Sequence, residues 1–349
     1  MVIYYFLLLY FWILSALEIG NAKIPRGIKA LSLVILITIM GFRYAIGADF
    51  FNYVHIFNHT DWFVEPIEMG CLFLMDVLQS IGLNAQSFFL VSSLITLIPI
   101  SYVIDKEIPK YFHVALCFYI ISFLYFEAMN TVRQGMAMAL CFLALFLYHN
   151  HKRFLSYLII AVSFFFHQSS FVIVTIYILA CFIKTNRWLY LLFILLSFVF
   201  GKYLLDMIGD YAYLFMHSEY AMEKRGVSSG AFQIFLNLTA IILVLFYNKY
   251  FQNSTEISRS CKLYVMSIVI YNIFINFYVV LRLYYYFFMS IIILIPFLLS
   301  YQKKLARVFI FNTFFLFFSI YSLVSLNNSN YNNFKFNFDL QTVVNSNKE

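Results

Sequence analysis

The sequence predicts an all-α, polytopic membrane protein: a transmembrane bundle of about twelve helices with long outer loops and a short re-entrant or interfacial helix. Of its 349 residues, 63% are hydrophobic and only 11% are charged. Soluble domains of this size carry a much larger share of charged residues. Many apolar stretches also approach the length of roughly 17–25 residues that a helix needs to cross a bilayer. The composition therefore excludes a soluble enzyme.

The expected helices follow the apolar runs that span a bilayer, or nearly so. These runs cover residues 2–19, 28–45, 86–104, 111–127, 130–148, 154–167, 169–183, 188–205, 230–248, 261–280, 282–300 and 306–326. The first run lacks a basic flank and a small-residue cleavage site, so we expect a retained helix rather than a signal peptide. Residues 1–326 are predicted to form one transmembrane domain. Residues 327–349 are predicted to be a polar C-terminal tail that lies at the outer face or is partly disordered.

The stretch Pro66–Gly82 decides the topology. It carries Glu68, Asp76 and Gln79 and is short, which is typical of an interfacial or re-entrant helix. If it does not span and the N-terminus lies outside, 15 of the 23 Lys and Arg residues fall on inner loops. If it spans, the basic turn His149–Arg153 lies outside, which the positive-inside rule disfavours.

The runs 154–167 and 169–183 are short for full spans, about 21–22 Å at 1.5 Å per residue. The pair is flanked on both sides by basic residues. They predict a tight hairpin whose tip, His167-Gln168-Ser169-Ser170, stops below the outer surface. Irregular polar backbone at such a depth is tolerated where it lines a water-filled cavity.

Three polar clusters interrupt the chain: Arg43–Asp49, Asn130–Gln134 and Phe166–Ser169. An arginine in or near the bilayer costs roughly 2.5–3.5 kcal/mol and is tolerated mainly beside a partner or ligand. In the preferred topology all three clusters lie at outer helix ends, together with Arg282. We therefore expect a functional site at this end.

Each candidate has a functional and a structural interpretation. Arg133, with Asn130 and Gln134 at a helix start, suits an anion site; alternatively, Arg133 extends to the interface beside a capping Asn130. Arg43 and Asp49 flank Gly47 and could form an ion pair that closes the loop, which does not prevent Arg43 from also holding a phosphate.

The other candidates are isolated polar residues. His167 ends an apolar run and is either structural or catalytic. Arg282 precedes three tyrosines and is either an interfacial anchor or a ligand for an anion. Glu65 and Glu68 either bind sugar hydroxyls or are simply solvated.

Neither a metal nor a cofactor is expected. His55, His59 and Asp61 have helical metal-ligand spacing but no third histidine. The five cysteines are scattered through apolar runs, as buried packing residues are.

At these clusters the chain resembles the EpsG family, within the broader group of Wzy-type polysaccharide polymerases. The matching strings, in family order, are Arg43-Tyr44…Gly47-Ala48-Asp49-Phe50, Glu65-Pro66, Asn130…Arg133-Gln134…Ala137 and Phe166-His167…Ser169. The multi-helix layout agrees over nearly the whole chain. Ala48 and Phe50 stand where the family has Thr and Tyr, so no hydroxyl role carries over to them.

The resemblance implies a GT-C-like, metal-independent glycosyltransferase of the bacterial inner membrane. It would polymerise undecaprenyl-pyrophosphate-linked oligosaccharide repeat units at the outer, periplasmic face, making capsule, O-antigen or exopolysaccharide. Its partners would be the lipid-linked oligosaccharide, the growing glycan and the bilayer, with a chain-length regulator and a flippase as candidate protein partners and no nucleic acid.

The resemblance also suggests roles for the candidate residues. Arg133, Arg43 and Arg282 would hold the pyrophosphate and offset its developing charge. Asp49, slightly favoured, or His167 would be the base that deprotonates the acceptor. The candidate sugar-binding residues are Asn130, Gln134, Glu65 and Glu68.

Two other functions remain open. A flippase or other transporter of lipid-linked oligosaccharide usually shows internal repeats and polar residues at mid-membrane, and neither is evident here. A glycan ligase or acyltransferase is the second alternative. A ligase uses the same donor chemistry, so the sequence does not separate it from a polymerase.

Overall fold

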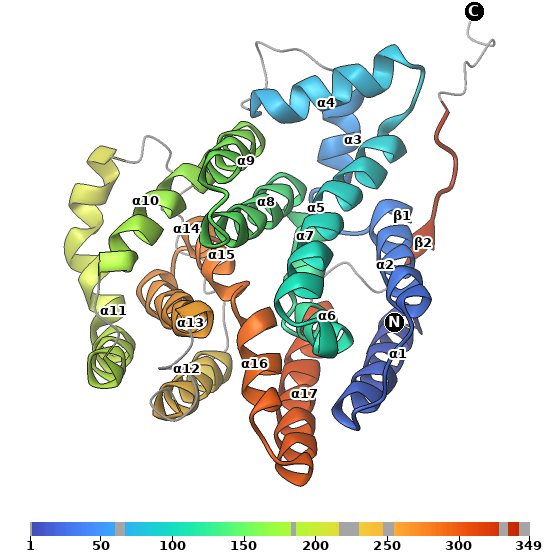
Figure 1. Cartoon of the computed structure of the whole chain (residues 1–349). Coiled ribbons are helices and arrows are strands. Elements are labelled where there is room, and N and C mark those ends of the chain that lie inside the picture. The colour runs from blue at the N-terminus through green and yellow to red at the C-terminus, as the bar shows by residue number, and fades with distance from the viewer. Residues whose placement is uncertain are drawn as a thin grey trace, which may run out of the picture. The chain divides into compact units, whose positions relative to one another are not determined.

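The described part of the chain is helical almost throughout, which confirms the predicted all-α class (Figure 1). The structure is a computed structural model that describes residues 2–59, 67–182, 186–215, 230–246, 255–327 and 334–341. Within these ranges, four helices are long and apolar enough to cross a membrane: α1 (Val2–Ile19), α5 (Ala85–Glu107), α8 (Val132–His149) and α17 (Lys304–Asn327). These helices confirm a membrane helix bundle.

The other elements are shorter or less uniformly apolar. The helices are α2 (Arg26–Gly41), α3 (Phe50–Asn58), α4 (Met69–Ser80), α6 (Phe112–Ile121), α7 (Leu124–Asn130), α9 (Arg153–Phe166), α10 (Ser169–Phe182), α11 (Arg187–Phe215), α12 (Gly230–Leu245), α13 (Thr255–Phe274), α14 (Tyr278–Leu281), α15 (Tyr284–Phe288) and α16 (Ile291–Ser300), with a 3₁₀ turn at Pro109–Tyr111. The strands are β1 (Arg43–Tyr44) and β2 (Lys335–Phe336).

Several apolar runs are broken where the sequence predicts one helix. The run 111–127 forms the 3₁₀ turn followed by α6 and then α7, which is bent by 53° from the preceding segment. The break lies at Phe123, whose φ of 70° is in the left-handed region. No glycine or proline marks it. The runs 261–280 and 282–300 are likewise each divided, into α13 and α14 and into α15 and α16.

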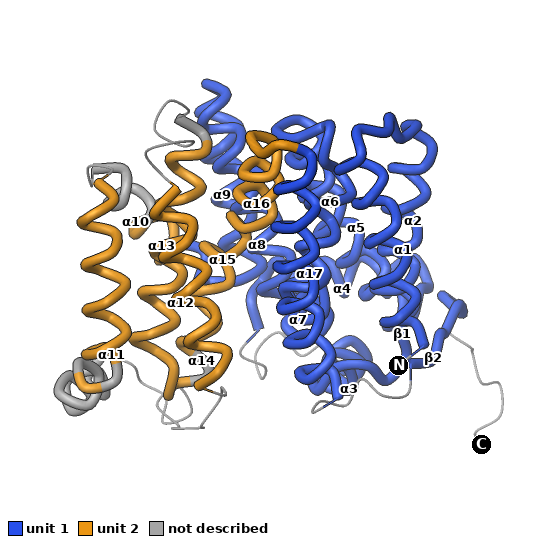
Figure 2. Tube along the Cα trace, turned by 90° about the horizontal axis from the view of Figure 1, so that it is seen from below, with its two compact units in different colours: residues 1–171, 304–349 blue, residues 172–303 orange. Residues whose placement is uncertain are grey.

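The chain forms two compact units (Figure 2). The first contains residues 1–171 and 304–349, and the second contains residues 172–303. The single transmembrane domain expected over residues 1–326 stays a prediction.

The first unit is built around α5, α6 and α8. Helix α5 packs against α2 and α8, α8 packs against α9, and α6 packs against α1 and α17. Every residue of α6 is buried. The hydroxyls of Ser92 and Thr96 on α5 donate to backbone carbonyls of their own helix. These two hydroxyls are therefore satisfied within α5 itself, as buried polar groups in an apolar environment require.

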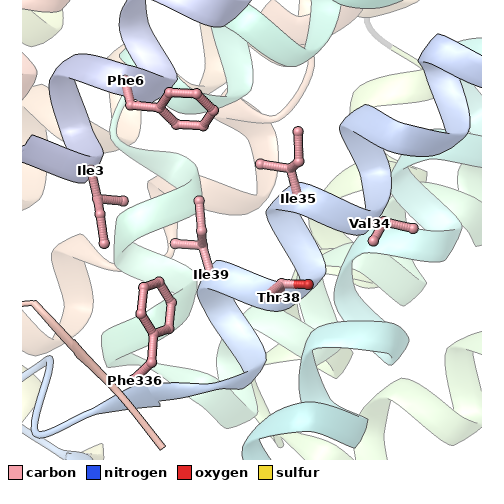
Figure 3. A pocket seen from close by; sticks show the side chains of 7 residues that line it. All are labelled: Ile3, Phe6, Val34, Ile35, Thr38, Ile39 and Phe336. Carbon is pink, nitrogen blue, oxygen red and sulfur yellow. The ribbon is translucent and has the colours of Figure 1, made fainter. Parts of the chain in front are cut away.

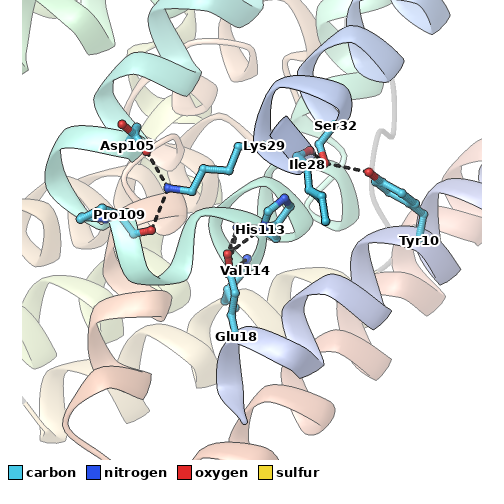
Figure 4. Close-up of polar contacts among 9 residues, drawn as sticks. All are labelled: Tyr10, Glu18, Ile28, Lys29, Ser32, Asp105, Pro109, His113 and Val114. Carbon is cyan, nitrogen blue, oxygen red and sulfur yellow. Dashed lines mark hydrogen bonds and ion pairs between the residues drawn. The ribbon is translucent and has the colours of Figure 1, made fainter. Parts of the chain in front are cut away.

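A buried carboxylate caps α6. Glu18, at the end of α1, accepts hydrogen bonds from the backbone N–H groups of His113 and Val114 (Figure 4). It also contacts Nδ1 of His113 at 2.7 Å. A carboxylate at a helix N-terminus satisfies donors that have no partner within the helix. On neighbouring elements, Lys29 pairs with Asp105 at 2.6 Å.

The C-terminal tail returns to the first unit. Strand β2 pairs antiparallel with β1, with Phe336 opposite Arg43. The N–H of Asn337 donates to the Phe42 carbonyl at 2.9 Å, and the Asn84 side chain donates to two tail carbonyls. The described part of the tail is therefore tied to the end of α2 and the start of α5 by hydrogen bonds to its backbone.

The second unit holds a buried amide cluster. Asn272 of α13 exchanges hydrogen bonds with Asn237 of α12, accepts one from Gln233 and donates to Ser197 of α11. Hydrogen bonds between side-chain amides of this kind hold helices together in an apolar environment.

Candidate functional site

A single carboxylate joins two of the predicted site residues. Glu68, which directly precedes α4, forms an ion pair with Nη1 of Arg133 through Oε2. Its other oxygen, Oε1, lies 2.6 Å from Nδ1 of His167. The Glu68 side chain is only 10% exposed, whereas those of Arg133 and His167 are each 28% exposed. The cluster is therefore anchored by a largely buried carboxylate, and its two other members, Arg133 and His167, are more exposed.

Arg133 is held from a second side by a tyrosine. Its Nε donates to the hydroxyl of Tyr53 at 3.4 Å. Nη2 makes no hydrogen bond or ion pair with any residue that the structure describes, and the side chain is partly exposed, so its N–H groups are available to a ligand. Arginine suits this arrangement because its planar fork offers five donors in a fixed geometry.

The contact with Glu68 fixes the tautomer of His167. An ionised carboxylate only accepts hydrogen bonds, so Nδ1 carries the proton and donates. Nε2 has no partner among the described residues. In the neutral ring Nε2 is then the unprotonated nitrogen, which is the one that a general base uses.

The surroundings of Glu68 keep it ionised. Burial alone would raise the pKa of its carboxyl group. The hydrogen bond from His167 and the charge of Arg133 outweigh this effect and lower the pKa from 4.5 to about 2. Burial also raises the pKa of the Tyr53 phenol, so this hydroxyl stays protonated beside Arg133.

This lowered pKa predicts how stability depends on pH. Because the folded state favours the carboxylate, Glu68 contributes stability that is complete above the unfolded pKa and is lost as the pH falls toward about 2. The thermal unfolding midpoints of wild type and Glu68→Gln should be measured in detergent as a function of pH. The difference between them should be constant above about pH 5 and should shrink below that pH. A difference that stays constant down to about pH 3 would contradict this ionisation state.

A shared apolar core positions the site residues. Phe50, Tyr53 and Phe57 occupy one face of α3 and pack against Cys71 and Met75 of α4. The same core includes residues of α5 and, from α8, Val132 and Met136. Tyr53 and Arg133 therefore project from elements fixed by one continuous cluster.

Gly70 allows α4 to approach α9 closely. A Cβ at this position would lie 2.7 Å from the carbonyl oxygen of Phe165, which is closer than real Cβ atoms come. The thiol of Cys71 also contacts the Phe166 carbonyl, at 3.8 Å. These contacts set Glu68, two residues before Gly70, against His167 at the end of α9.

Gly70→Ala is therefore expected to push α4 away from α9 and separate Glu68 from His167. Overpacking of this kind costs about 1–3 kcal/mol, which should lower the thermal unfolding midpoint and reduce activity. Gly27→Ala is the matched control, because a Cβ at Gly27 meets nothing within 4 Å. Equal behaviour of the two variants would show that the close packing does not matter.

Asp49 and Asn130 lie on the Tyr53 side of the cluster. The N–H of Asp49 donates to Oδ1 of Asn130 at 3.3 Å. Gly47 lies in the turn before Asp49 with a φ of 93°, a conformation that favours glycine. The charge of Asp49 acts on the Tyr53 phenol. The first and second polar clusters are therefore in contact.

Arg43 is buried, with only 1% of its surface exposed. Its Nη1 donates to the Met40 carbonyl and its Nη2 to the Met129 carbonyl, the latter at 2.7 Å. The guanidinium also lies over the Phe89 ring, 4.6 Å from the centroid. In this structure Arg43 holds the end of α7 against α2, and its role as a pyrophosphate ligand stays a prediction.

The remaining predicted residues are placed elsewhere or are not described. Gln134 is buried at the start of α8, next to Arg133. Arg282 follows α14 in the second unit. Glu65 lies outside the described residues, as does Asp61, the third residue of the weak metal pattern. The roles predicted for these residues stay predictions.

A separate groove of about 320 Å³ lies between α1 and α2 (Figure 3). Its lining is Ile3, Phe6, Val34, Ile35, Thr38, Ile39 and Phe336. The lining contains no charged side chain. It therefore differs in chemistry from the Arg133–Glu68–His167 cluster and does not contribute to it.

Comparison with protein families identifies the chain. The model of the EpsG family matches residues 28–338, which is most of the sequence and includes every residue of the cluster. The chain belongs to the EpsG family. No curated protein and no solved structure matches it.

Membership of the EpsG family confirms the resemblance and supports a Wzy-like polysaccharide polymerase embedded in a membrane. One residue of the site in this EpsG-family protein, Tyr53, was not among those predicted from the sequence. Its spacing of three and four residues from Phe50 and Phe57 indicates only the buried face of a helix. The contact with Arg133 appears only when α3 and α8 are brought together.

Proposed function

We propose that this protein is a metal-independent glycosyltransferase that joins polyprenyl-pyrophosphate-linked oligosaccharide repeat units at the outer face of a bacterial inner membrane. The observation that carries the proposal is the Arg133–Glu68–His167 cluster. One largely buried carboxylate holds both a partly exposed guanidinium and a partly exposed imidazole. This pairing suits a reaction with an anionic leaving group and an acceptor that must lose a proton.

The reaction exchanges the glycosyl phosphate bond of the donor for a glycosidic bond to the acceptor. The bond between the anomeric carbon and the pyrophosphate oxygen breaks, and the leaving pyrophosphate takes the electron pair. The acceptor hydroxyl bonds to the anomeric carbon and loses its proton. Arg133 offers Nη2 to the pyrophosphate and offsets the charge that develops there. Stabilisation of developing charge by a preorganised donor usually contributes more to such a rate than any other single effect.

His167 is the base that the geometry favours. Its Nε2 is open while Glu68 holds Nδ1, so it can take the proton of the acceptor. Glu68, predicted as a sugar-binding residue, instead acts as a positioning residue. Asp49, which the sequence favours as the base, remains the alternative because it lies near Tyr53, which contacts Arg133.

The other predicted residues have supporting roles in this proposal. Asn130 and Gln134, at the junction of α7 and α8, together with Glu65 would contact the sugars. The expected partners are the lipid-linked oligosaccharide, the growing glycan and the bilayer, with a chain-length regulator and a flippase as protein partners.

The length distribution of surface polysaccharide tests this function. Cells that lack the gene should display single repeat units without long chains. Wild type should restore the chains, and Arg133→Ala, expressed at the same level, should not. Repeat units trapped inside the cell would instead indicate a flippase. Full-length polymer that is unattached or altered in a substituent would indicate a ligase or an acyltransferase.

A further inference from the structure

An unusual apolar stripe runs along the exposed side of α4. Met69, Phe73 and Val77 lie four residues apart, and Ile81 follows directly after the helix. Their exposed fractions are 63%, 64%, 41% and 65%. Residues spaced by four lie on one side of a helix, so these side chains form a continuous surface. We name it the α4 stripe.

The opposite side of α4 is also apolar. Cys71, Leu72, Met75 and Leu78 are buried against the first unit. A helix with a buried apolar face normally shows polar residues on its other side. The α4 stripe departs from this pattern, and contiguous exposed apolar surface of this kind indicates contact with something other than water.

The length of α4 limits its orientation in a membrane. Twelve residues measure about 18 Å, against roughly 30 Å for the hydrocarbon core, so α4 cannot span. Figure 1 shows α4 side-on at the periphery of the first unit. A short apolar helix at the edge of a membrane protein can instead lie in the plane of the interface.

The helix against which α4 packs, α9, also carries exposed apolar side chains. Gly70 brings α4 against the backbone of Phe165 in α9. Phe164 and Phe165 of α9 are 42% and 53% exposed. Leu158 and Val162 of the same helix are also exposed. In a membrane protein, an exposed apolar helix surface of this kind faces lipid. The occupant that suits the α4 stripe is therefore the same hydrocarbon.

We propose that α4 lies in the membrane interface with the α4 stripe inserted into the hydrocarbon of the leaflet on the site's side. This membrane contact anchors the N-terminal end of α4, where Glu68 directly precedes Met69. One consequence rests on the proposed function: Arg133, Glu68 and His167 lie at the depth of lipid phosphates. A lipid-linked pyrophosphate therefore reaches Arg133 without leaving its leaflet.

Depth-dependent fluorescence quenching tests this placement. The native tryptophans Trp12, Trp62 and Trp188 are replaced by Phe, and a single tryptophan is introduced as Phe73→Trp. The full-length protein is reconstituted into phosphatidylcholine vesicles whose chains are brominated either near the headgroup or near the chain end. Lys335→Trp, at an exposed position of β2, is the matched control.

We expect strong quenching of Phe73→Trp by shallow bromines, weaker quenching by deep bromines, and little quenching of Lys335→Trp by either. If Phe73→Trp does not fold, Val77→Trp replaces it. Strongest quenching by deep bromines, or accessibility to aqueous acrylamide equal to that of the control, would overturn the proposal. Shielding from both brominated lipid and acrylamide would show that protein covers the stripe, which also overturns it. No substrate is present, so the result is independent of whether the protein polymerises glycans.

Discussion

Replacing Arg133 by alanine is expected to slow polymer formation by about 10²–10³-fold, the usual effect of removing one preorganised donor from a developing anion. The reason is that Nη2 is the open cationic group of the cluster, while Tyr53 and Glu68 hold the rest of the guanidinium. The rate should be measured with purified protein in vesicles and a defined lipid-pyrophosphate-linked repeat unit.

Two further variants separate charge from geometry. Arg133→Lys keeps the charge but cannot contact Tyr53, Glu68 and a phosphate at once, so it should recover little of the rate. Arg26→Ala removes an exposed arginine from the start of α2 and should leave the rate unchanged. An Arg133→Ala protein that polymerises at the wild-type rate would remove this arginine from the mechanism.

Replacing His167 by alanine is the second large expected effect, a loss of about 10²–10⁴-fold, as for the removal of a general base. Glu68 fixes the proton on Nδ1 and leaves Nε2 for the acceptor. The loss should appear mainly in the rate at saturating donor, because Arg133 still binds the pyrophosphate. His55→Ala, at an exposed position of α3, is the control.

Asp49→Asn distinguishes the two candidate bases. The geometry predicts that it has a smaller effect than His167→Ala. A large loss for Asp49→Asn together with near-normal activity for His167→Ala would assign the base to Asp49, as the sequence alone favours.

The fold was predictable because hydrocarbon imposes simple rules. An apolar run must satisfy its backbone internally, so the runs of this chain become helices with ends close to those expected, such as α1 and α9. The breaks were not predictable. Phe123 adopts a left-handed conformation without the glycine that usually allows one, and only tertiary packing selects it.

The site was partly predictable. Arg133, His167 and Glu68 stand out because polar groups are costly among apolar helices. Their meeting could not be read from the sequence, because it depends on the approach that Gly70 allows between α4 and α9. The burial of Arg43 could not be predicted either. Its partners are the backbone carbonyls of Met40 and Met129, and every residue has such a group.

The pairing of the C-terminal tail could not be predicted from the sequence either. Its composition indicates a polar surface segment, yet β2 pairs with β1 through backbone groups that any residue possesses. Two-residue strands of this kind have no pattern of alternating residues from which to predict them.

The central claim is that Glu68 and His167 act as one unit, and a double-mutant cycle tests it most directly. Polymerisation rates of Glu68→Gln, His167→Ala and the double variant would be compared in vesicles at a fixed concentration of donor. If Glu68 acts mainly by orienting His167, the double variant should be about as slow as His167→Ala alone, because residues that act together lose their effect together. If the two losses multiply, the residues act independently and this account of the site is wrong.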